Sequence, residues 1–260
     1  MEGRASVPDT LARLVSCLLP EESWPETPLA GQAAVLIAFY GGTDALRLVF
    51  VEKTAYSREH AGQIAFPGGS VEPGDRDRVA TALREAYEET GIEAATVVPL
   101  GELPSSATLI SRGGHEVTPV VGWWNGRGPE EGRIGGLSPY GRDGLTPYGR
   151  TPYERGPYER GLHERGLHEA PYGLAPYELM PHDTGEIAAV HTIGVDALLD
   201  PANRLTWVHP SGFSGPGFVI DDLFIWGFTA KILDTTFALA GWNRPWDVRR
   251  RSAIPARFLG

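Results

Sequence analysis

The stretch from Phe66 to Ile92, FPGGSVEPGDRDRVATALREAYEETGI, constrains this chain more than any other. It begins with a Pro-Gly-Gly loop. Apolar residues then recur every three or four positions, which predicts a helix that ends at Gly91, with Asp75 as a candidate N-cap. Backbone carbonyls of the loop and carboxylates of the helix can converge on one spot. Such a spot suits a hard cation.

Three carboxylates lie on one face of the predicted helix. Glu85, Glu88 and Glu89 stand at positions i, i+3 and i+4, within about one turn of one another. Like charges so close repel each other unless a cation lies among them. Mg²⁺ and Mn²⁺ take oxygen ligands and are commonly held by one or two carboxylates, waters and substrate phosphates. The alternative is a solvated helix face, and the glycine loop together with Arg84 favours the metal site.

These residues resemble the box of the Nudix hydrolase family, G-x5-E-x7-R-E-U-x-E-E-x-G-U, where U is a bulky apolar residue. The second half of the box matches at Arg84, Glu85, Ala86, Glu88, Glu89, Gly91 and Ile92. The first half departs from the pattern in two ways. After Gly69 and five intervening residues, the position of the first Glu holds Asp75, and eight residues separate Asp75 from Arg84 where the pattern has seven. Asp75 is therefore not counted among the expected metal ligands.

The segment before the box narrows the resemblance. REHAGQIAFPGG, from Arg58 to Gly69, is similar to the signature of the coenzyme A pyrophosphatase branch, which tends to carry the longer spacing. The resemblance covers roughly residues 32–124 and 185–242. It implies an α/β class, with a Nudix-type α/β/α sandwich built on a mixed sheet. It also implies metal-dependent hydrolysis of coenzyme A or its thioesters into 3',5'-adenosine bisphosphate and 4'-phosphopantetheine or its acyl derivative.

The resemblance assigns roles to the residues of the box. Glu88 and Glu89 are expected to bind Mg²⁺ or Mn²⁺, together with the backbone carbonyl of Gly68. Glu85 is the candidate that orients or deprotonates the attacking water, and it is a further candidate metal ligand. Arg84 is expected to pair with a neighbouring carboxylate and hold it in place.

Further candidates lie outside the helix. Glu186 is the candidate carboxylate that completes the metal site, and the alternative is an exposed acid at the start of a strand. The expected substrate-binding residues are Arg58, His60, Gln63 and Gly69. A guanidinium offers a fixed fork of donors to phosphate oxygens, which suits Arg58, although a surface salt bridge is the alternative. For His60 the alternative is a polar loop residue.

Two other functions are compatible with these residues. The first is hydrolysis of another nucleoside diphosphate derivative, such as ADP-ribose or an oxidised nucleotide. The second is a Nudix-fold binding module without catalysis. The intact Arg84, Glu85, Glu88 and Glu89 argue against the second function, because a non-catalytic protein has no physical need for mutually repelling acids.

Composition limits the partners. The net charge of −10 argues against a nucleic-acid-binding surface, so we expect a nucleotide-containing small molecule as substrate and no nucleic acid. The single cysteine, Cys17, indicates a reducing compartment. No apolar run is long enough to span a membrane and no secretory signal is present, which predicts a cytoplasmic protein without a membrane partner. The sequence leaves a homodimer open.

The 260 residues divide into five parts. The expected parts are an N-terminal helix and loop (1–28), the first part of the Nudix domain with the box at 68–92 (29–124), an insertion (125–184), the second part of the domain (185–245) and a C-terminal tail (246–260). In the insertion a five-residue unit repeats as TPYGR, TPYER, GPYER, GLHER and GLHEA from Thr146 to Ala170. A glycine or proline in every unit leaves no apolar face, so we expect disorder.

Patterns outside the box predict the remaining elements. A helix is expected at 8–19 and another at 229–242. Strands are expected at 32–40, 46–53, 94–103, 116–124, 186–195 and 205–210, the first two as a hairpin. Pro119 suggests that its strand is an edge strand or carries a bulge. Residues 211–217 are expected to form a turn, followed by two short strands around Asp221 and Asp222.

Overall fold

The computed structural model describes residues 7–19, 32–42, 45–55, 61–104, 109–110, 116–126 and 179–258. The described residues belong to one compact unit, which comprises residues 1–128 and 177–260. The pentapeptide repeat lies outside the described residues. Within them, none of the helices has the length and apolar character needed to cross a membrane.

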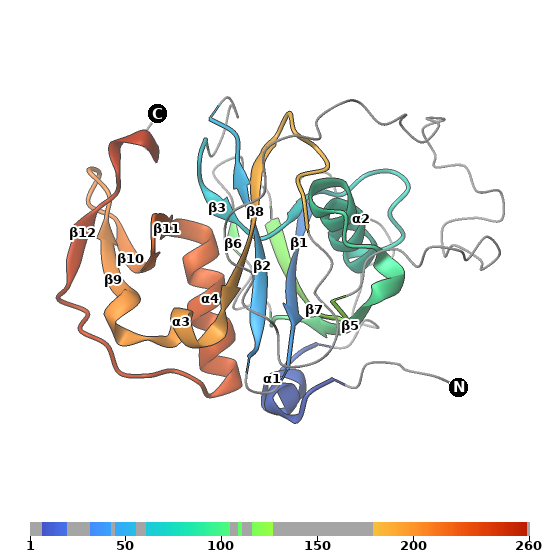
Figure 1. The fold of residues 1–260 in the computed structure, drawn as a ribbon, viewed down its shortest axis with the longest axis horizontal. Coiled ribbons are helices and arrows are strands. Elements are labelled where there is room, and N and C mark those ends of the chain that lie inside the picture. The colour runs from blue at the N-terminus through green and yellow to red at the C-terminus, as the bar shows by residue number, and fades with distance from the viewer. Residues whose placement is uncertain are drawn as a thin grey trace, which may run out of the picture. The chain divides into compact units, whose positions relative to one another are not determined.

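A mixed eight-stranded sheet forms the centre of this unit (Figure 1). Its main path runs β3-β2-β1-β7-β5, with β4 on β1, β6 on β7 and β8 on β2. The strands are β1 (Gln32–Tyr40), β2 (Arg47–Lys53), β3 (Ile64–Ala65), β4 (Gly68–Ser70), β5 (Val97–Glu102), β6 (Leu109–Ile110), β7 (Glu116–Trp124) and β8 (Ile187–Gly194). The pair β1 and β7 is parallel and the others are antiparallel, so the expected mixed sheet and the β1–β2 hairpin are confirmed.

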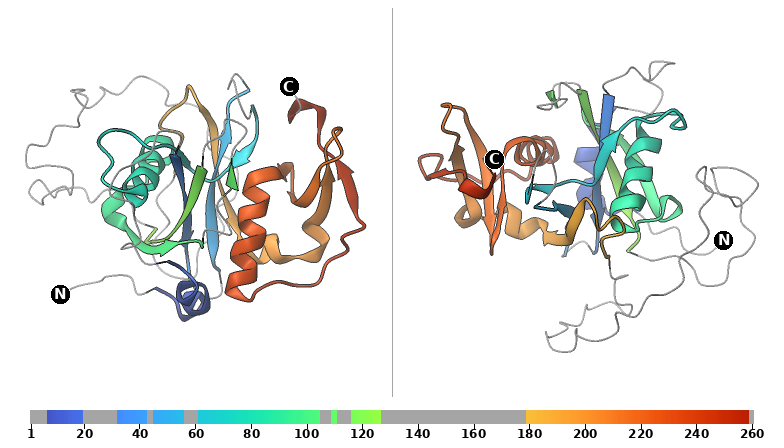
Figure 2. Two further views of the ribbon diagram at one scale, coloured as in Figure 1. Left: turned by 180° about the vertical axis from the view of Figure 1, so that it is seen from behind. Right: turned by 90° about the horizontal axis from the view of Figure 1, so that it is seen from above.

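Helices cover both faces of the sheet, as the view from above shows (Figure 2). α2 (Arg78–Thr90) lies on one face, while α1 (Ala12–Ser16) and α4 (Gly227–Ala240) lie on the other. Alternation along β1 explains the two layers, because successive side chains of a strand point to opposite faces. Leu36 packs in the cluster that contains Leu83 of α2, whereas Ile37 and Phe39 pack in the cluster that contains Phe237 of α4.

The C-terminal residues form a second sheet that the sequence patterns did not predict. Its order is β11-β10-β9-β12. The strands are β9 (Arg204–Val208), β10 (Ser214–Ile220), β11 (Leu223–Ile225) and β12 (Arg251–Ala253). The expected turn at 211–217 is present only in its first residues, where Gly212 N donates to the His209 carbonyl, and the rest of the expectation is wrong because β10 begins at Ser214. Its glycines serve packing, since a Cβ on Gly215 would lie 3.0 Å from the Trp207 ring. The expected tail contributes β12, which pairs with β9 in parallel.

Pro119 lies in an inner strand, so the expectation of an edge strand or a bulge in β7 is wrong. β7 pairs with β1 on one side and with β5 and β6 on the other. The Pro119 carbonyl accepts a hydrogen bond from Leu103 N (2.9 Å), just beyond the end of β5. Proline lacks the N–H that would return this bond. The sheet tolerates Pro119 because the missing bond falls where the β5 ladder ends.

The helical segments differ from the expected ranges mainly at their ends. Residues 8–19 form a 3-10 turn, η1 (Asp9–Leu11), and the short α1. Three further 3-10 turns are η3 (Ala94–Thr96) before β5, η5 (Pro201–Asn203) before β9 and η6 (Ala256–Phe258) after β12. Between β8 and β9 lies the short helix α3 (Val195–Leu199).

Candidate active site

The first turn of α2 has a different N-cap from the expected one. Asp77 caps the helix by accepting a hydrogen bond from Ala80 N (2.7 Å). Asp75 is buried instead, and its carboxylate accepts hydrogen bonds from the Thr81 hydroxyl (2.8 Å) and from Arg84 Nε (3.1 Å) and Nη2 (3.0 Å). Burial acts to raise the pKa of Asp75, but the hydrogen bonds from Arg84, Glu72 N and Thr81 together with the charge of Arg84 outweigh it, so the pKa is lowered. Asp75 therefore anchors Arg84.

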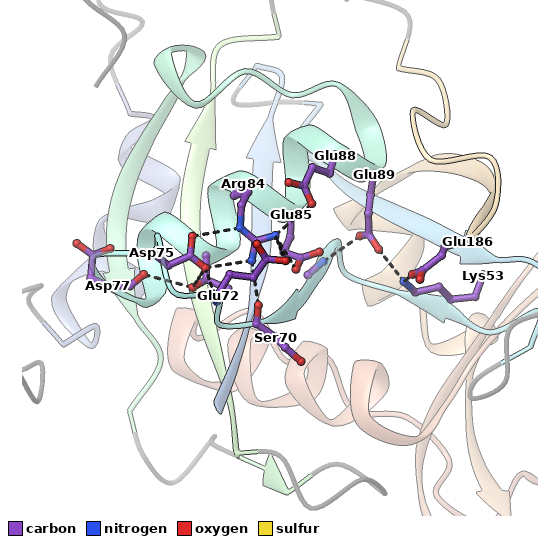
Figure 3. A network of polar contacts seen from close by, with 12 residues as sticks. Lys53, Ser70, Glu72, Asp75, Asp77, Arg84, Glu85, Glu88, Glu89 and Glu186 are labelled. Atoms are coloured by element: carbon purple, nitrogen blue, oxygen red, sulfur yellow. Dashed lines mark hydrogen bonds and ion pairs between the residues drawn. The ribbon is translucent and has the colours of Figure 1, made fainter. Parts of the chain in front are cut away.

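Arg84 joins the loop to three carboxylates (Figure 3). Besides Asp75, its guanidinium donates to Glu85 Oε1 (3.0 Å), Glu88 Oε2 (3.1 Å) and the Ser70 carbonyl (2.9 Å). A planar guanidinium has five N–H donors in a fixed geometry, so these partners together define its position. Arg84 thus holds Glu85 and Glu88 of its own helix against the end of β4.

Glu89 is the most deeply buried acid of the box, with 4% of its surface exposed. Its Oε1 lies 2.6 Å from Lys53 Nζ, and its Oε2 accepts a hydrogen bond from Gly68 N (3.0 Å). Burial raises the pKa of Glu89, although Lys53 and the Gly68 N–H act in the opposite direction. Burial disfavours the ammonium of Lys53, but the charges of Glu89, Glu186 and Glu85 and the hydrogen bond to Glu89 together outweigh it, so the pKa of Lys53 is raised.

Lys53 is a site residue that the sequence analysis missed. It is the last residue of β2, 36 positions before Glu89. A signal was present, because only Lys53 and Lys231 are lysines among the 23 lysine and arginine residues. The chain uses arginine almost everywhere else, so a lysine directly after a buried strand was informative.

Glu85 packs on the glycine loop. A Cβ on Gly69 would lie 2.4 Å from Glu85 Oε1, so only glycine leaves room for this carboxylate without movement. Burial raises the pKa of Glu85 to about 7; Arg84 acts against this shift, and the neighbouring carboxylates of Glu89 and Glu88 add to it. Glu85 is thus a carboxyl group that can hold or release a proton near neutral pH.

The pairing register directs the backbone of Gly68 toward α2. Leu36 N donates to the Pro67 carbonyl (2.8 Å) and Val71 N donates to the Gln32 carbonyl (3.0 Å). In an antiparallel pair the residues midway between hydrogen-bonded positions point their N–H and C=O away from the partner strand. Gly68 opposite Val35 is such a residue. Its N–H reaches Glu89, and its carbonyl lies on the same outer side of β4.

Of the remaining predicted site residues, Glu186 and Gln63 lie beside Lys53. Glu186 is 69% exposed, and its Oε2 lies 3.6 Å from Lys53 Nζ, so Lys53 stands between Glu89 and Glu186 (Figure 3). The Gln63 carbonyl accepts a hydrogen bond from Lys53 N (3.0 Å). Arg58 and His60 lie outside the described residues.

The donor atoms that converge here are carboxylate and carbonyl oxygens, which are the ligands that Mg²⁺ and Mn²⁺ prefer. In the part of the chain that the structure describes, no three His, Cys, Asp or Glu side chains are grouped closely enough to hold a metal ion. The two basic residues explain this arrangement, because Lys53 pairs with Glu89 while Arg84 pairs with Glu85 and Glu88. The donor set therefore fits a divalent cation, provided that the carboxylates turn from these partners.

Comparison with known proteins agrees with this geometry. Residues 31–133 match a family model described as the NUDIX domain. This part of the chain is similar to a NUDIX domain. The matched residues include β1, β2, β4 and α2, and the match agrees with the family resemblance of the box. The finer assignment to the coenzyme A branch stays a prediction.

Curated relatives cover the same region. Proteins from Yersinia pestis (strain Pestoides F) and Yersinia pseudotuberculosis (serotype O:1b, strain IP 31758), each described as an uncharacterized Nudix hydrolase NudL, are 48% identical to this chain over 75 residues. The matched segment is 29% of this chain and 36% of each relative. The chain therefore spans little more than a third of the length of these relatives.

Solved structures are similar at low identity. A MutT/nudix family protein from Enterococcus faecalis is 13% identical, with 83% of this chain and 64% of that chain covered and a TM-score of 0.41. An Ap4A hydrolase from C. elegans, in a binary complex, is 21% identical, with 36% of this chain and 66% of that chain covered and a TM-score of 0.29.

Proposed function

We propose that this protein is a divalent-metal-dependent hydrolase that cleaves the pyrophosphate bond of coenzyme A or its thioesters. The observation that carries the proposal is that Glu89 binds Gly68 N and Glu85 lies against Gly69, with Glu88 joined to Glu85 through Arg84, within the segment that matches the NUDIX model. The products would be 3',5'-adenosine bisphosphate and 4'-phosphopantetheine or its acyl derivative. The substrate is thus a nucleotide-containing small molecule.

The metal ligands that we propose are Glu88, Glu89 and the carbonyl of Gly68, with Glu85 and Glu186 as further ligands. Mg²⁺ or Mn²⁺ bound there would neutralise the charge that builds on the non-bridging and leaving oxygens of a diphosphate. Glu89 is buried and fixed at both oxygens, whereas the more exposed Glu88 and Glu186 have freedom to turn toward an ion.

Glu85 is the proposed base. It accepts a proton from a water molecule, whose oxygen forms a bond to phosphorus while the bridging phosphorus–oxygen bond breaks in line. Gly69 and Arg84 fix the Glu85 carboxylate from two sides, through a close backbone contact and a 3.0 Å hydrogen bond. Arg84 therefore acts by positioning the base, and Asp75 positions Arg84.

The coenzyme A part of the proposal rests on the segment from Arg58 to Gly69. Arg58, His60, Gln63 and Gly69 are the proposed substrate-binding residues. A NUDIX domain with the same carboxylates is also compatible with ADP-ribose or an oxidised nucleotide as substrate, and with a module that binds without hydrolysis.

A turnover panel tests the proposal. The purified protein is given Mg²⁺ or Mn²⁺ with coenzyme A, ADP-ribose and an oxidised nucleoside triphosphate, and the products are separated by chromatography. We expect the highest kcat/KM with coenzyme A. After chelation of the metal we expect no hydrolysis. A higher kcat/KM with ADP-ribose or the oxidised nucleotide would show that coenzyme A is not the preferred substrate. If the protein hydrolyses none of the three compounds, a non-catalytic binding module is favoured.

Glu89→Gln provides the matched variant for this panel. It should lower kcat by about 100-fold or more, the scale on which removing one group that stabilises transition-state charge acts. Circular dichroism should show that the variant remains folded. Near-normal turnover by folded Glu89→Gln would contradict the assignment of Glu89.

A further inference from the structure

The site contains two basic side chains, Arg84 and Lys53, that differ in how firmly their partners hold them. Arg84 bonds to four partners from a planar group, so losing one contact leaves its position unchanged. Lys53 presents a compact ammonium on a flexible stem, and its side-chain contacts are Glu89 at 2.6 Å and Glu186 at 3.6 Å. A lysine ammonium is a point charge with rotatable donors, and it gives up a partner more readily than a bidentate arginine does.

Glu89 needs a cation in every state of the site. Removing one member of a buried ion pair is strongly destabilising, because the other charge is left buried without a partner. In this structure Lys53 supplies the charge, and it binds the same carboxylate that is the proposed metal ligand. Two cations close to one carboxylate repel each other, so a divalent ion at Glu89 and the ammonium of Lys53 compete.

We propose that Lys53 is a displaceable counter-cation, which neutralises Glu89 before a metal binds and is then released to bind the diphosphate of the substrate. This inference rests on the proposed function. Release leaves Nζ within reach of the site, because its main chain is held at the end of β2 by bonds to Gln63 and to β8. Glu186, the other contact of Nζ, is itself a proposed metal ligand, so metal binding would draw both carboxylates away from the ammonium.

Lysine labelling on the wild-type protein tests the release. The chain has two lysines, and Lys231 lies exposed on α4, so it serves as an internal reference. A short pulse of an amine-reactive acetylating reagent, followed by peptide mass spectrometry, gives the ratio of labelling at the two lysines. We expect Mn²⁺ or Mg²⁺ to raise the Lys53 ratio several-fold, and methylene diphosphonate added with the metal to lower it again.

Each outcome of the labelling experiment supports or contradicts a stated part of the proposal. Metal binding is measured on the same sample by calorimetry. If metal binds and the ratio stays constant or falls, the release of Lys53 is wrong while the proposed function stands. If metal raises the Lys53 labelling ratio but the diphosphonate does not lower it again, the proposed contact between Lys53 and the substrate diphosphate is contradicted. Absence of metal binding would overturn both the inference and the proposed function.

Lys53→Met and Lys231→Met form a matched pair of variants. Lys53→Met removes the ammonium that competes with the metal for Glu89. Mn²⁺ should therefore raise the thermal midpoint of Lys53→Met more than it raises the midpoint of Lys231→Met, which should respond to Mn²⁺ as the wild type does. Lys53→Met should also raise KM more than it lowers kcat. An equal or smaller response to Mn²⁺ in Lys53→Met would contradict the competition. If the variant does not fold, the labelling of the wild type decides.

Discussion

Asp75 shows how one residue of the site obtains its role from distant atoms. As a short acid shortly before a helix it is a plausible N-cap, yet Asp77 takes that position. Asp75 turns inward and binds two nitrogens of Arg84 and the hydroxyl of Thr81. A carboxylate that accepts charge-assisted hydrogen bonds in a buried place contributes more than a surface cap does. The departure from the box at Asp75 therefore leaves the anchoring of Arg84 intact.

Asp75→Asn should lower the free energy of unfolding by about 2 kcal/mol at neutral pH, because hydrogen bonds to a charged group contribute on this scale. The lowered pKa of Asp75 also predicts a pH dependence. Its stabilisation is complete above the ordinary value of 3.8 and is lost as pH falls through the lower value in the folded protein. Urea unfolding as a function of pH measures both effects.

Asp77→Asn is the control for this measurement. Asparagine caps a helix about as well as aspartate, so this variant should unfold close to the wild type. The acid limb of the stability curve should become shallower in Asp75→Asn and not in Asp77→Asn. If both variants lose the same stability, Asp75 has no special role in holding Arg84.

At the scale of elements, the site is the contact between β4 and α2. β4 pairs with β1 over three positions, and α2 packs on the same region. Two consecutive glycines bring the two elements together for different reasons. A Cβ on Gly68 would lie 2.4 Å from the Ala34 carbonyl oxygen, whereas a Cβ on Gly69 would meet the flexible end of Glu85.

Gly68→Ala and Gly69→Ala should therefore have different effects. The first forces apart two backbones and should cost about 1–3 kcal/mol of unfolding free energy, the range for overpacking. The second moves only the Glu85 carboxylate, so it should lower kcat more than stability. Thermal unfolding and turnover of both variants separate the effects. Equal loss of stability in the two variants would contradict this difference.

At the scale of the molecule, residues 179–186 lie close to the site. Leu179 packs against the cluster under α2, and His182 N donates to the Glu89 carbonyl (3.2 Å). The His182 ring contacts the ring of Tyr87, a residue that is 46% exposed. Residues 179–186 thus connect α2 to β8 and carry Glu186 to Lys53.

Excision of residues 132–176 in favour of a short Gly-Ser linker should leave the thermal midpoint nearly unchanged, because the repeat is expected to bury no core. A longer excision of 132–181 is the matched comparison. It also removes Leu179, so its midpoint should be lower. Calorimetric melting of both variants provides the measurement, and a large drop with the shorter excision would show that the repeat contributes to the core.

The sequence by itself determined α2, its three carboxylates and the glycine loop, because these depend on short-range periodicity and spacing, whereas the mixed sheet was implied by the family resemblance. Tertiary structure alone decided the partners. Lys53 reaches Glu89 across 36 positions, and β12 pairs with β9 across more than 40. Such contacts depend on how separate elements pack, and packing leaves no period in either segment. For this reason the acids of the site were visible in the sequence, while the lysine that neutralises the most buried of them was not.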